Sequence, residues 1–375
     1  MIDSAEALEP VVRAGLASPS IAVDAEGDGL YRYRARLCTL QIAAGATIAV
    51  VDTLAVTDRA RLAALLGPSG PEKILHDAAF DARLLAQEGV TLGHVFDTAA
   101  AARFLGEVST GLSSLLAAVL GVHVEKDLQQ ADWGKRPLDE ASVAYLEEDV
   151  RHLGALAEAL RERCAAAGIL EEVRIESAYG ARAPREADVL PWTRVKGAGE
   201  LRRGTERAIL REVALVRERF AEADDVPPFR VLPNALLLAL ARRGLEGSQG
   251  SQGSQGSVLG RVRRRELSEA LREAIARGAE AGEVPAEELA VFRPPPPPPA
   301  EREAQKKRER ALLAWRARAS EERGVGLQVV LPGHCLRALA ARGALDAEEL
   351  AGIEGLGACR LERYGAALVA VLAGA

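Results

Sequence analysis

Aromatic residues are scarce in this chain of 375 residues, since Phe, Trp and Tyr together make up only 4% of it. Its cores must therefore be built from aliphatic side chains, and a hydrophobic fraction of 48% is ample for that. An excess of positive charge is also lacking, because 48 Lys and Arg stand against 54 Asp and Glu. A net charge of −6 argues against binding of nucleic acid through bulk charge, although it leaves room for a local basic groove.

Paired cysteines and long apolar runs are missing as well. The four cysteines are scattered and include no C-x-x-C pair, so neither a zinc site nor a disulfide framework is indicated. No apolar run reaches the roughly 18 residues that a membrane span requires, and the N-terminus shows no basic and apolar export signal. We therefore expect a cytoplasmic protein that does not enter a membrane.

The first 170 residues or so alternate between predicted strands and helices. Five segments have the apolar and β-branched composition of strands: 21–26, 36–42, 47–52, 73–76 and 95–96. Turns that contain glycine follow the first two segments and predict a meander, whereas helices are predicted between and after the later ones. A meander followed by strands that alternate with helices predicts a mixed sheet covered by helices.

From about residue 200 onward the pattern is helical throughout. A Gly-Ser-Gln repeat at 247–257 has the composition of a flexible tether, and a proline run at 294–299 is typical of a stiff spacer. A weak internal repeat relates 211–232 to 313–331 and suggests one small helical module used twice. We divide the chain accordingly into an α/β domain at 1–170, a linker at 171–199, a helical domain at 200–285, a proline-rich linker at 286–300 and a second helical domain at 301–375.

Asp24 and Glu26 stand at the end of the first predicted strand. Side chains alternate between the two faces of a strand, so these carboxylates, two residues apart, point the same way. Neighbouring carboxylates repel each other, and a hard divalent metal with oxygen ligands removes that conflict. For a D-x-E pair taken alone, a solvated strand end is the alternative. Asp28, in the turn that follows, is expected to be exposed to solvent.

Further acidic residues stand downstream. Asp81 falls one turn into the helix predicted after the fourth strand, where an Asp also suits the helix dipole. Tyr145 and Asp149 are four residues apart and therefore share a helix face. Before that helix lies DWGKRPL at 132–138, a dense and rare combination. Each feature carries little weight alone, and their order along the chain is more informative.

Taken together, these motifs resemble ribonuclease D, a family of DEDD-type 3′–5′ exonucleases whose third motif carries a Tyr. The matching stretches are DAE at 24–26, HDAAFD at 76–81 with DT at 97–98, DWGKRPL at 132–138, and Tyr145 with Asp149. The Trp-x-x-Arg-Pro-Leu pattern is the most specific, because it separates ribonuclease D from DNA-proofreading relatives. The two helical pieces resemble HRDC modules (helicase and ribonuclease D C-terminal), which extends the resemblance to nearly the whole chain.

The resemblance implies a ribonuclease H-like α/β exonuclease domain, with a mixed central sheet flanked by helices, followed by two small all-α HRDC-like domains. It also implies two divalent metal ions, Mg²⁺ or Mn²⁺, held by four carboxylates: Asp24, Glu26, Asp81 and Asp149. Asp24 is expected to bridge both ions. Tyr145 is expected to orient the attacking water by a hydrogen bond.

The implied activity is 3′–5′ trimming of structured RNA such as tRNA precursors by a monomer, with release of nucleoside 5′-monophosphates. A DNA exonuclease stays open as an alternative, because the acidic motif does not read the sugar and no contact to the 2′-hydroxyl can be located in the sequence. A catalytically idle nucleic-acid-binding protein is a third alternative. The complete set of four carboxylates with Tyr145 disfavours it.

Several side chains are candidates for nucleic-acid contacts. Leu40 and Phe80 suit stacking near the terminal bases, although packing in a core explains both at least as well. Trp133 and Arg136 are candidates within the DWGKRPL segment. The helical pieces contribute basic candidates: Arg263, Arg264, Lys306 and Lys307. Glutamates interleave with these basic clusters, so a solvated and ion-paired helix face is the alternative.

Overall fold

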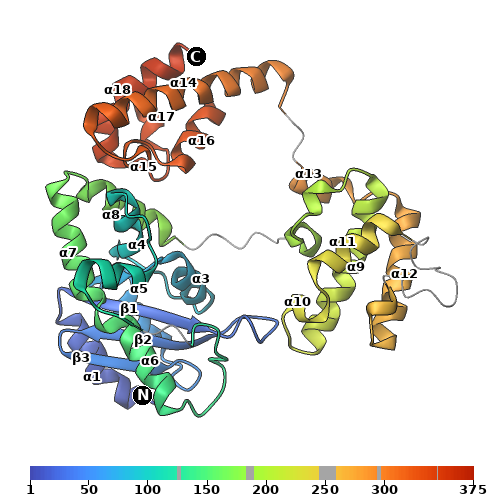
Figure 1. Ribbon diagram of the computed structural model, residues 1–375, viewed down its shortest axis with the longest axis horizontal. Coiled ribbons are helices and arrows are strands. Elements are labelled where there is room, and N and C mark those ends of the chain that lie inside the picture. The colour runs from blue at the N-terminus through green and yellow to red at the C-terminus, as the bar shows by residue number, and fades with distance from the viewer. Residues whose placement is uncertain (125–127, 183–189, 245–258, 294–296, 344) are drawn as a thin grey trace. The chain divides into compact units, whose positions relative to one another are not determined.

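The computed structural model describes residues 1–124, 128–182, 190–244, 259–293, 297–343 and 345–375 (Figure 1). The chain forms two compact units. The first comprises residues 1–28, 36–184 and 297–375, and the second comprises 29–35 and 185–296. The expected Gly-Ser-Gln tether at 247–257 and the first half of the proline run at 294–299 lie outside the described residues.

A five-stranded sheet forms the centre of the first unit. Its strands are β1 (Ser20–Gly27), β2 (Leu37–Ala44), β3 (Thr47–Asp52), β4 (Glu72–Leu75) and β5 (Val95–Asp97), in the order β3-β2-β1-β4-β5. The first three strands pair antiparallel, whereas β4 pairs parallel to both β1 and β5. The predicted mixed sheet is confirmed, and β1 is its central strand.

Eight helices of the first unit precede its C-terminal module: α1 (Ala5–Leu16), α2 (Arg59–Leu66), α3 (Ala79–Gln87), α4 (Thr98–Leu105), α5 (Leu112–Leu115), α6 (Glu140–Arg151), α7 (Leu153–Ala166) and α8 (Leu170–Gly180). A short π-helix, η1 (Leu116–Leu120), continues α5. Helix α1 packs on β2 and β3, α6 on the three antiparallel strands, and α7 on β1 and β4 (Figure 1). Side-chain oxygens of Asp97 and Asp139 accept hydrogen bonds from the backbone and begin α4 and α6, respectively.

The second unit is a helical domain with its own core. It contains α9 (Gly204–Ala223), α10 (Pro228–Val231), α11 (Asn234–Arg243), α12 (Arg265–Ala281) and α13 (Ala286–Phe292), with the short 3₁₀ helices η2 (Pro191–Arg194), η3 (Ala198–Glu200) and η4 (Leu259–Arg261). Val213, Leu237 and Leu271 are fully buried in this core. The first module therefore folds with a packed interior despite the Gly-Ser-Gln repeat, and α13 occupies part of the expected linker at 286–300.

The C-terminal module repeats the same pattern of a long, a short and a medium helix. Its helices are α14 (Pro299–Arg323), α15 (Leu327–Val330), α16 (Gly333–Arg342), α17 (Ala347–Ala351) and α18 (Gly357–Ala373). The order α14–α15–α16 matches α9–α10–α11, in line with the weak internal repeat. Val329 is fully buried in a core cluster that also contains Phe104 of α4 and Val173 of α8. This module thus packs on the α/β part of the first unit.

Helix α8 provides the surface for that packing. Its Glu172 is 2% exposed and forms ion pairs with Arg323 and Arg363 of the C-terminal module. Gly357 has a φ of +73°, and a Cβ there would lie 2.3 Å from Cδ1 of Ile175. Glycine therefore permits the close approach of the two elements. Helix α8, docked on the next module, occupies the first part of the expected linker at 171–199.

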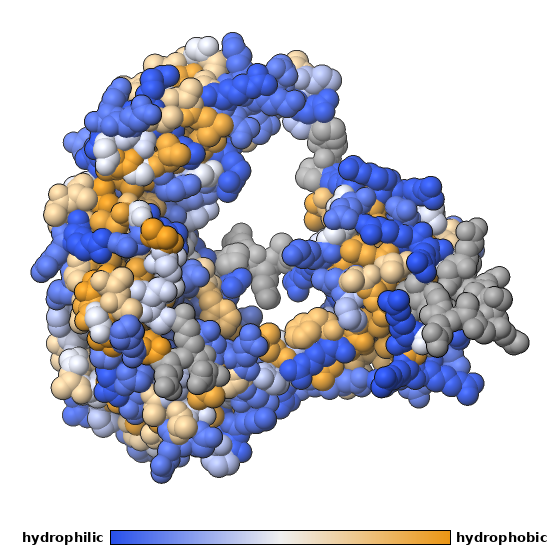
Figure 2. Space-filling model, in the orientation of Figure 1, coloured by the Kyte–Doolittle hydropathy of each residue, from blue (hydrophilic) through white to orange (hydrophobic). Residues whose placement is uncertain are grey.

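The face of the molecule seen in Figure 2 is largely polar. Hydrophilic side chains cover most of the visible face, and apolar residues show through in patches between them (Figure 2). No helix within the described ranges is both long and apolar enough to cross a membrane.

Candidate active site

The central strand β1 carries the first two carboxylates. Asp24 pairs across the sheet with Gln41 of β2 and Glu26 pairs with Thr39, so both acidic side chains leave the same face of the strand. The ladder shifts register between Glu26 and Gly27, where β1 ends. The acidic pair therefore lies at the C-terminal end of the central strand, next to the helices that cover this face.

Helix α6 brings a third carboxylate to this edge. Oxygen atoms of Asp24, Glu26 and Asp149 all lie within 4.8 Å of one another. It is the only such group of three metal-ligating side chains in the described part of the chain. Asp149 thus lies beside Asp24 and Glu26, although it is 123 or more positions away from them in the sequence.

Asp81 lies in the first turn of α3 and is 3% exposed. Its Oδ1 atom is buried and has no hydrogen-bond partner in the described structure. The charges of Asp24 and Glu26 act on it, which places it beside the other carboxylates. The start of α3 is held by Asp97, whose carboxylate accepts hydrogen bonds from the backbone N–H groups of Asp77 and Ala78 at 3.0 and 3.3 Å.

Burial and mutual repulsion raise the pKa values of the carboxylates in this cluster. Burial raises the pKa of Asp24 to about 7. Burial, with the charges of Asp24 and Asp149, raises the pKa of Glu26 to about 9, and burial with the charge of Asp24 raises that of Asp149 to about 8. Burial also raises the pKa of Asp81 well above its ordinary value, with Asp24 adding to the effect. Acidic groups this close cannot all ionise unless positive charge joins them.

The donor set fits a hard divalent cation. It offers carboxylate oxygens only, which is the chemistry that Mg²⁺ and Mn²⁺ prefer. The buried Oδ1 of Asp81 lacks a partner, and a cation among the carboxylates would supply one. His76 stands nearby, but its Nδ1 is 2.9 Å from the hydroxyl of Thr98 and it is not part of the cluster.

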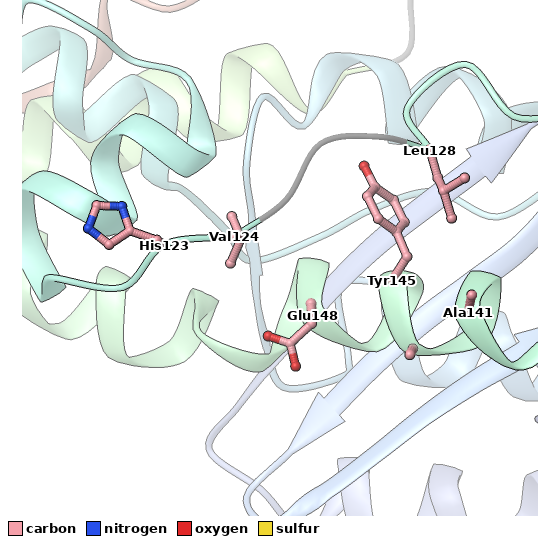
Figure 3. Close-up of a pocket in the computed structure, with 7 residues that line it drawn as sticks. His123, Val124, Leu128, Ala141, Tyr145 and Glu148 are labelled. Atoms are coloured by element: carbon pink, nitrogen blue, oxygen red, sulfur yellow. The ribbon is translucent and has the colours of Figure 1, made fainter.

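Tyr145 lies one turn before Asp149 on the same face of α6. Burial, with the charges of Asp149 and Glu26, raises the pKa of its phenol well above the ordinary value, so the protonated hydroxyl can donate a hydrogen bond. The ring stacks on Trp133 with 5.9 Å between ring centroids. Figure 3 shows the Tyr145 side chain rising from α6 into a cavity of about 600 Å³ that Leu128, His123 and Glu148 also line.

A second cavity, of about 410 Å³, contains the carboxylates themselves. Asp24, Glu26, Asp149 and Tyr145 line it together with His76 of the HDAAFD motif, and with groups that the sequence motifs did not single out, namely Arg103, Thr110, Ser113 and Gln129. Arg103 had no distinguishing signal, because an Arg in the last turn of a helix is a common choice. Only the packing of α4 against the site reveals its place.

Three predicted nucleic-acid contacts are corrected by burial and bonding. Leu40 is 0% exposed and Trp133 is 1% exposed, so neither side chain can reach a base. Arg136 donates all five of its N–H groups within the protein: to both oxygens of Asp52, and to the carbonyl oxygens of Cys38, Trp133 and Lys135. It is a clamp between the end of β3 and the segment that precedes α6.

Asp28 also differs from expectation. It is 0% exposed, and its carboxylate accepts hydrogen bonds at 2.7–2.8 Å from the guanidinium and the backbone N–H of Arg36. The turn folds back on the Arg, so the expected solvent exposure is wrong. The pairing also explains why Asp28 does not join the acidic cluster.

The remaining candidates for nucleic-acid contact stay predictions. Phe80 is 46% exposed next to Asp81, and the side chains of Lys306 and Lys307 are exposed on α14. In the second unit, Arg263 is exposed. Arg264 lies over the ring of Phe220 and pairs with Asp224, so the expected alternative of an ion-paired face applies to it.

Comparison with known proteins agrees with this architecture. A family model described as 3′–5′ exonuclease matches residues 1–165, and the HRDC domain model matches 206–246 and 305–372. A ribonuclease D of Gluconacetobacter diazotrophicus is 32% identical over 250 residues, which cover 64% of this chain and 62% of that protein. The chain therefore spans less than two thirds of the length of the first curated relatives that it matches.

Two solved structures extend the match to the whole chain. Escherichia coli RNase D, described as an exoribonuclease involved in structured RNA processing, is 25% identical with a TM-score of 0.69, covering 100% of this chain and 98% of that one. A protein from Bifidobacterium adolescentis, 21% identical, has a TM-score of 0.73 and covers 100% of this chain and 97% of that one. The latter likeness shows the fold alone.

The sheet, its acidic cluster and the helical modules define a 3′–5′ exonuclease domain joined to HRDC domains. The chain is similar to ribonuclease D proteins over these residues. The fold class predicted from the sequence is confirmed.

Proposed function

We propose that this protein is a metal-dependent 3′–5′ exoribonuclease. The observation that carries the proposal is the convergence of Asp24, Glu26 and Asp149 within 4.8 Å, with the unpartnered carboxylate oxygen of Asp81 beside them. These residues occupy the positions that the family resemblance assigned to metal ligands. The ribonuclease D names of the relatives support RNA as the substrate.

The proposed cofactors are two divalent ions, Mg²⁺ or Mn²⁺, held by Asp24, Glu26, Asp81 and Asp149. When bound, such ions supply a nucleophilic water near neutral pH and positive charge for the leaving 3′-oxygen. Glu26 and Asp149 remain ionised in that state because the cation offsets their mutual repulsion. The protonated Tyr145 hydroxyl donates a hydrogen bond that holds the attacking water in line.

The proposed substrates are structured RNAs with a free 3′ end, such as tRNA precursors, and the proposed products are nucleoside 5′-monophosphates. The enzyme is proposed to act as a cytoplasmic monomer. The HRDC modules are proposed to hold the RNA, since no group of three metal-ligating side chains occurs in their described residues. Exposed Lys306 and Lys307 on α14 suit phosphate contact.

A time course on 5′-labelled RNA with an unpaired 3′ tail tests the proposal. The reaction is run with Mg²⁺ or Mn²⁺, with chelator, and with the Asp24→Asn and Asp149→Asn variants, alongside a DNA strand of matched sequence. The expected result is a ladder that shortens from the 3′ end on RNA, and that disappears with chelator and with either variant. Arg13→Gln, an exposed change on α1, serves as a control that keeps full activity.

The outcomes separate the alternatives. Equal ladders on RNA and DNA would replace the proposal with a broader exonuclease. Absence of a ladder with any divalent metal would leave a binding protein with an inactive acidic cluster. A ladder that persists in Asp149→Asn would remove the carboxylate cluster from the mechanism.

A further inference from the structure

The cavity that holds the carboxylates contains one strongly basic side chain among its described lining residues, Arg103. The other charged groups in its wall are acidic, with Asp77 adding to Asp24, Glu26 and Asp149. Arg103 lies on α4 one turn after Ala99, which lines the same cavity, so both face it from one side of the helix. The guanidinium of Arg103 is thus a single positive charge in a cavity whose other charged groups are acidic.

Arg103 is not held in the cavity by an ion pair within the described residues. Arg103 is exposed, and no ion pair joins it to any carboxylate in the described residues. Its charge acts on His76 in the cavity wall and on Glu176 of α8. The buried Oε2 atom of Glu176 has no hydrogen-bond partner in the described structure, so Arg103 does not bond to that atom. The five N–H groups of the guanidinium are therefore available to an acceptor from outside the described residues.

The chemistry of the substrate identifies an acceptor. Each RNA linkage carries a negative charge, and the carboxylates repel every linkage that is not compensated by a cation. Metal ions on the carboxylates offset the charge of the linkage being cut, whereas a neighbouring linkage in the same cavity needs a cation from the protein. An Arg fork matches the two free oxygens of a phosphodiester.

Resting on the proposed function, we propose that Arg103 binds a backbone phosphate of the RNA 3′ end inside the catalytic cavity. It positions the strand across the carboxylates and does not take part in bond cleavage. The rival role is structural, because Arg103 in the last turn of α4 also complements the helix dipole. The two roles differ in which measurement responds.

The first test is steady-state kinetics on a short 3′-tailed RNA. It compares the parent with Arg103→Gln, Arg103→Lys and the exposed control Arg13→Gln. Loss of a charged hydrogen bond to phosphate is expected to raise KM by about tenfold in Arg103→Gln and to leave kcat within about twofold. Arg103→Lys keeps the charge but loses the fork, so an intermediate KM is expected. Thermal unfolding of all variants should be unchanged, whereas a role in the helix dipole alone would lower the midpoint and leave KM as it was.

Binding measured at several salt concentrations isolates the phosphate contact. In an Asp149→Asn background, which blocks cleavage, the slope of log Kd against log salt should fall by about 0.7 when Arg103 is replaced by Gln. Single phosphates near the 3′ end are then replaced with uncharged methylphosphonates. At one linkage, this replacement should weaken RNA binding about tenfold in the protein that retains Arg103, and far less in Arg103→Gln. That coupling identifies the phosphate.

Arg103→Gln with the KM and salt slope of Arg13→Gln would overturn the inference, as would equal sensitivity of both proteins to every methylphosphonate. Failure of the proposed function is distinguishable, because then the unsubstituted protein itself would show no shortening of RNA. A protein that shortens RNA normally in the absence of Arg103 would retain the proposed function and reject only the role of this residue.

Discussion

Replacing Arg136 with Gln should loosen the helix that carries Tyr145 and Asp149. Arg136 lies four residues before the start of α6, and its Nε and Nη2 donate to Asp52 at 2.6 and 2.7 Å. The side chain of Asp52 is 6% exposed and that of Arg136 is 24% exposed. The pair is therefore mostly withdrawn from water, and screening reduces its strength only partly.

The cost of removing one partner follows from what is left behind. Asp52 would keep its hydrogen bonds from the backbone N–H groups of Leu54 and Ala55 but lose both guanidinium contacts. Breaking a buried ion pair on one side costs about 3–5 kcal/mol, and the partial exposure of Arg136 favours the lower end, about 3 kcal/mol. Arg136→Lys retains a charge but cannot satisfy Asp52 and three carbonyl oxygens together, so an intermediate loss is expected.

The effect should depend on pH in a defined direction. Burial alone would raise the pKa of Asp52, but the hydrogen bonds and charge of Arg136 hold it below its ordinary value. A pKa that is lower in the folded state contributes stability above the pKa of the unfolded chain, and this is lost as pH falls through the folded value. The difference between the parent and Arg136→Gln should therefore be full at pH 7 and shrink in strongly acidic buffer.

Urea unfolding followed by Trp fluorescence measures this difference. Three Trp residues lie in three different parts of the chain, so Trp192→Phe with Trp315→Phe leaves Trp133, beside the clamp, as the reporter. Every variant is compared in that background, with exposed Arg13→Gln as the control for a lost charge. A free energy of unfolding for Arg136→Gln within about 0.5 kcal/mol of the parent would refute the clamp, because that is the range of neutral surface changes.

Two further predictions concern the water and the RNA. Tyr145→Phe should lower kcat by about tenfold with little change in KM, since only the hydrogen bond to the attacking water is lost; unchanged turnover in a single-turnover assay would exclude Tyr145 from the mechanism. Lys306→Gln with Lys307→Gln should weaken binding of long RNA in a gel-shift titration and leave hydrolysis of a short oligomer unchanged. Equal losses on both substrates would contradict a role in RNA binding alone. These substitutions are preferable to deletion of 301–375, which would remove buried Val329 from the core it shares with α4 and α8.

Local patterns were enough to predict the strands and which side chains share one face of a single element, whereas the acidic cluster was implied by the family resemblance. Alternation along β1 placed Asp24 and Glu26 on one face, and helical spacing placed Tyr145 one turn from Asp149. Each inference needs only the geometry of a single element. The convergence of those elements came from the order of the motifs, and the structure places Asp24, Glu26 and Asp149 within reach of one cation.

Side chains whose role depends on tertiary packing could not be assigned in this way. Trp133 and Arg136 stand in a rare motif, but rarity does not tell whether a residue contacts substrate or supports the residues that do. Asp28 was misjudged because a turn usually exposes its side chains, whereas here Arg36 covers it. Helix α8 was taken for a linker because its docking surface on the C-terminal module is remote in sequence.

The chain crosses the boundary between its two units four times, after residues 28, 35, 184 and 296. A single proteolytic nick therefore cannot free the second unit, because other covalent connections remain. Every added connection closes a loop and narrows the range of separations that the first HRDC module can sample. The effective concentration of the second unit around the first therefore stays high.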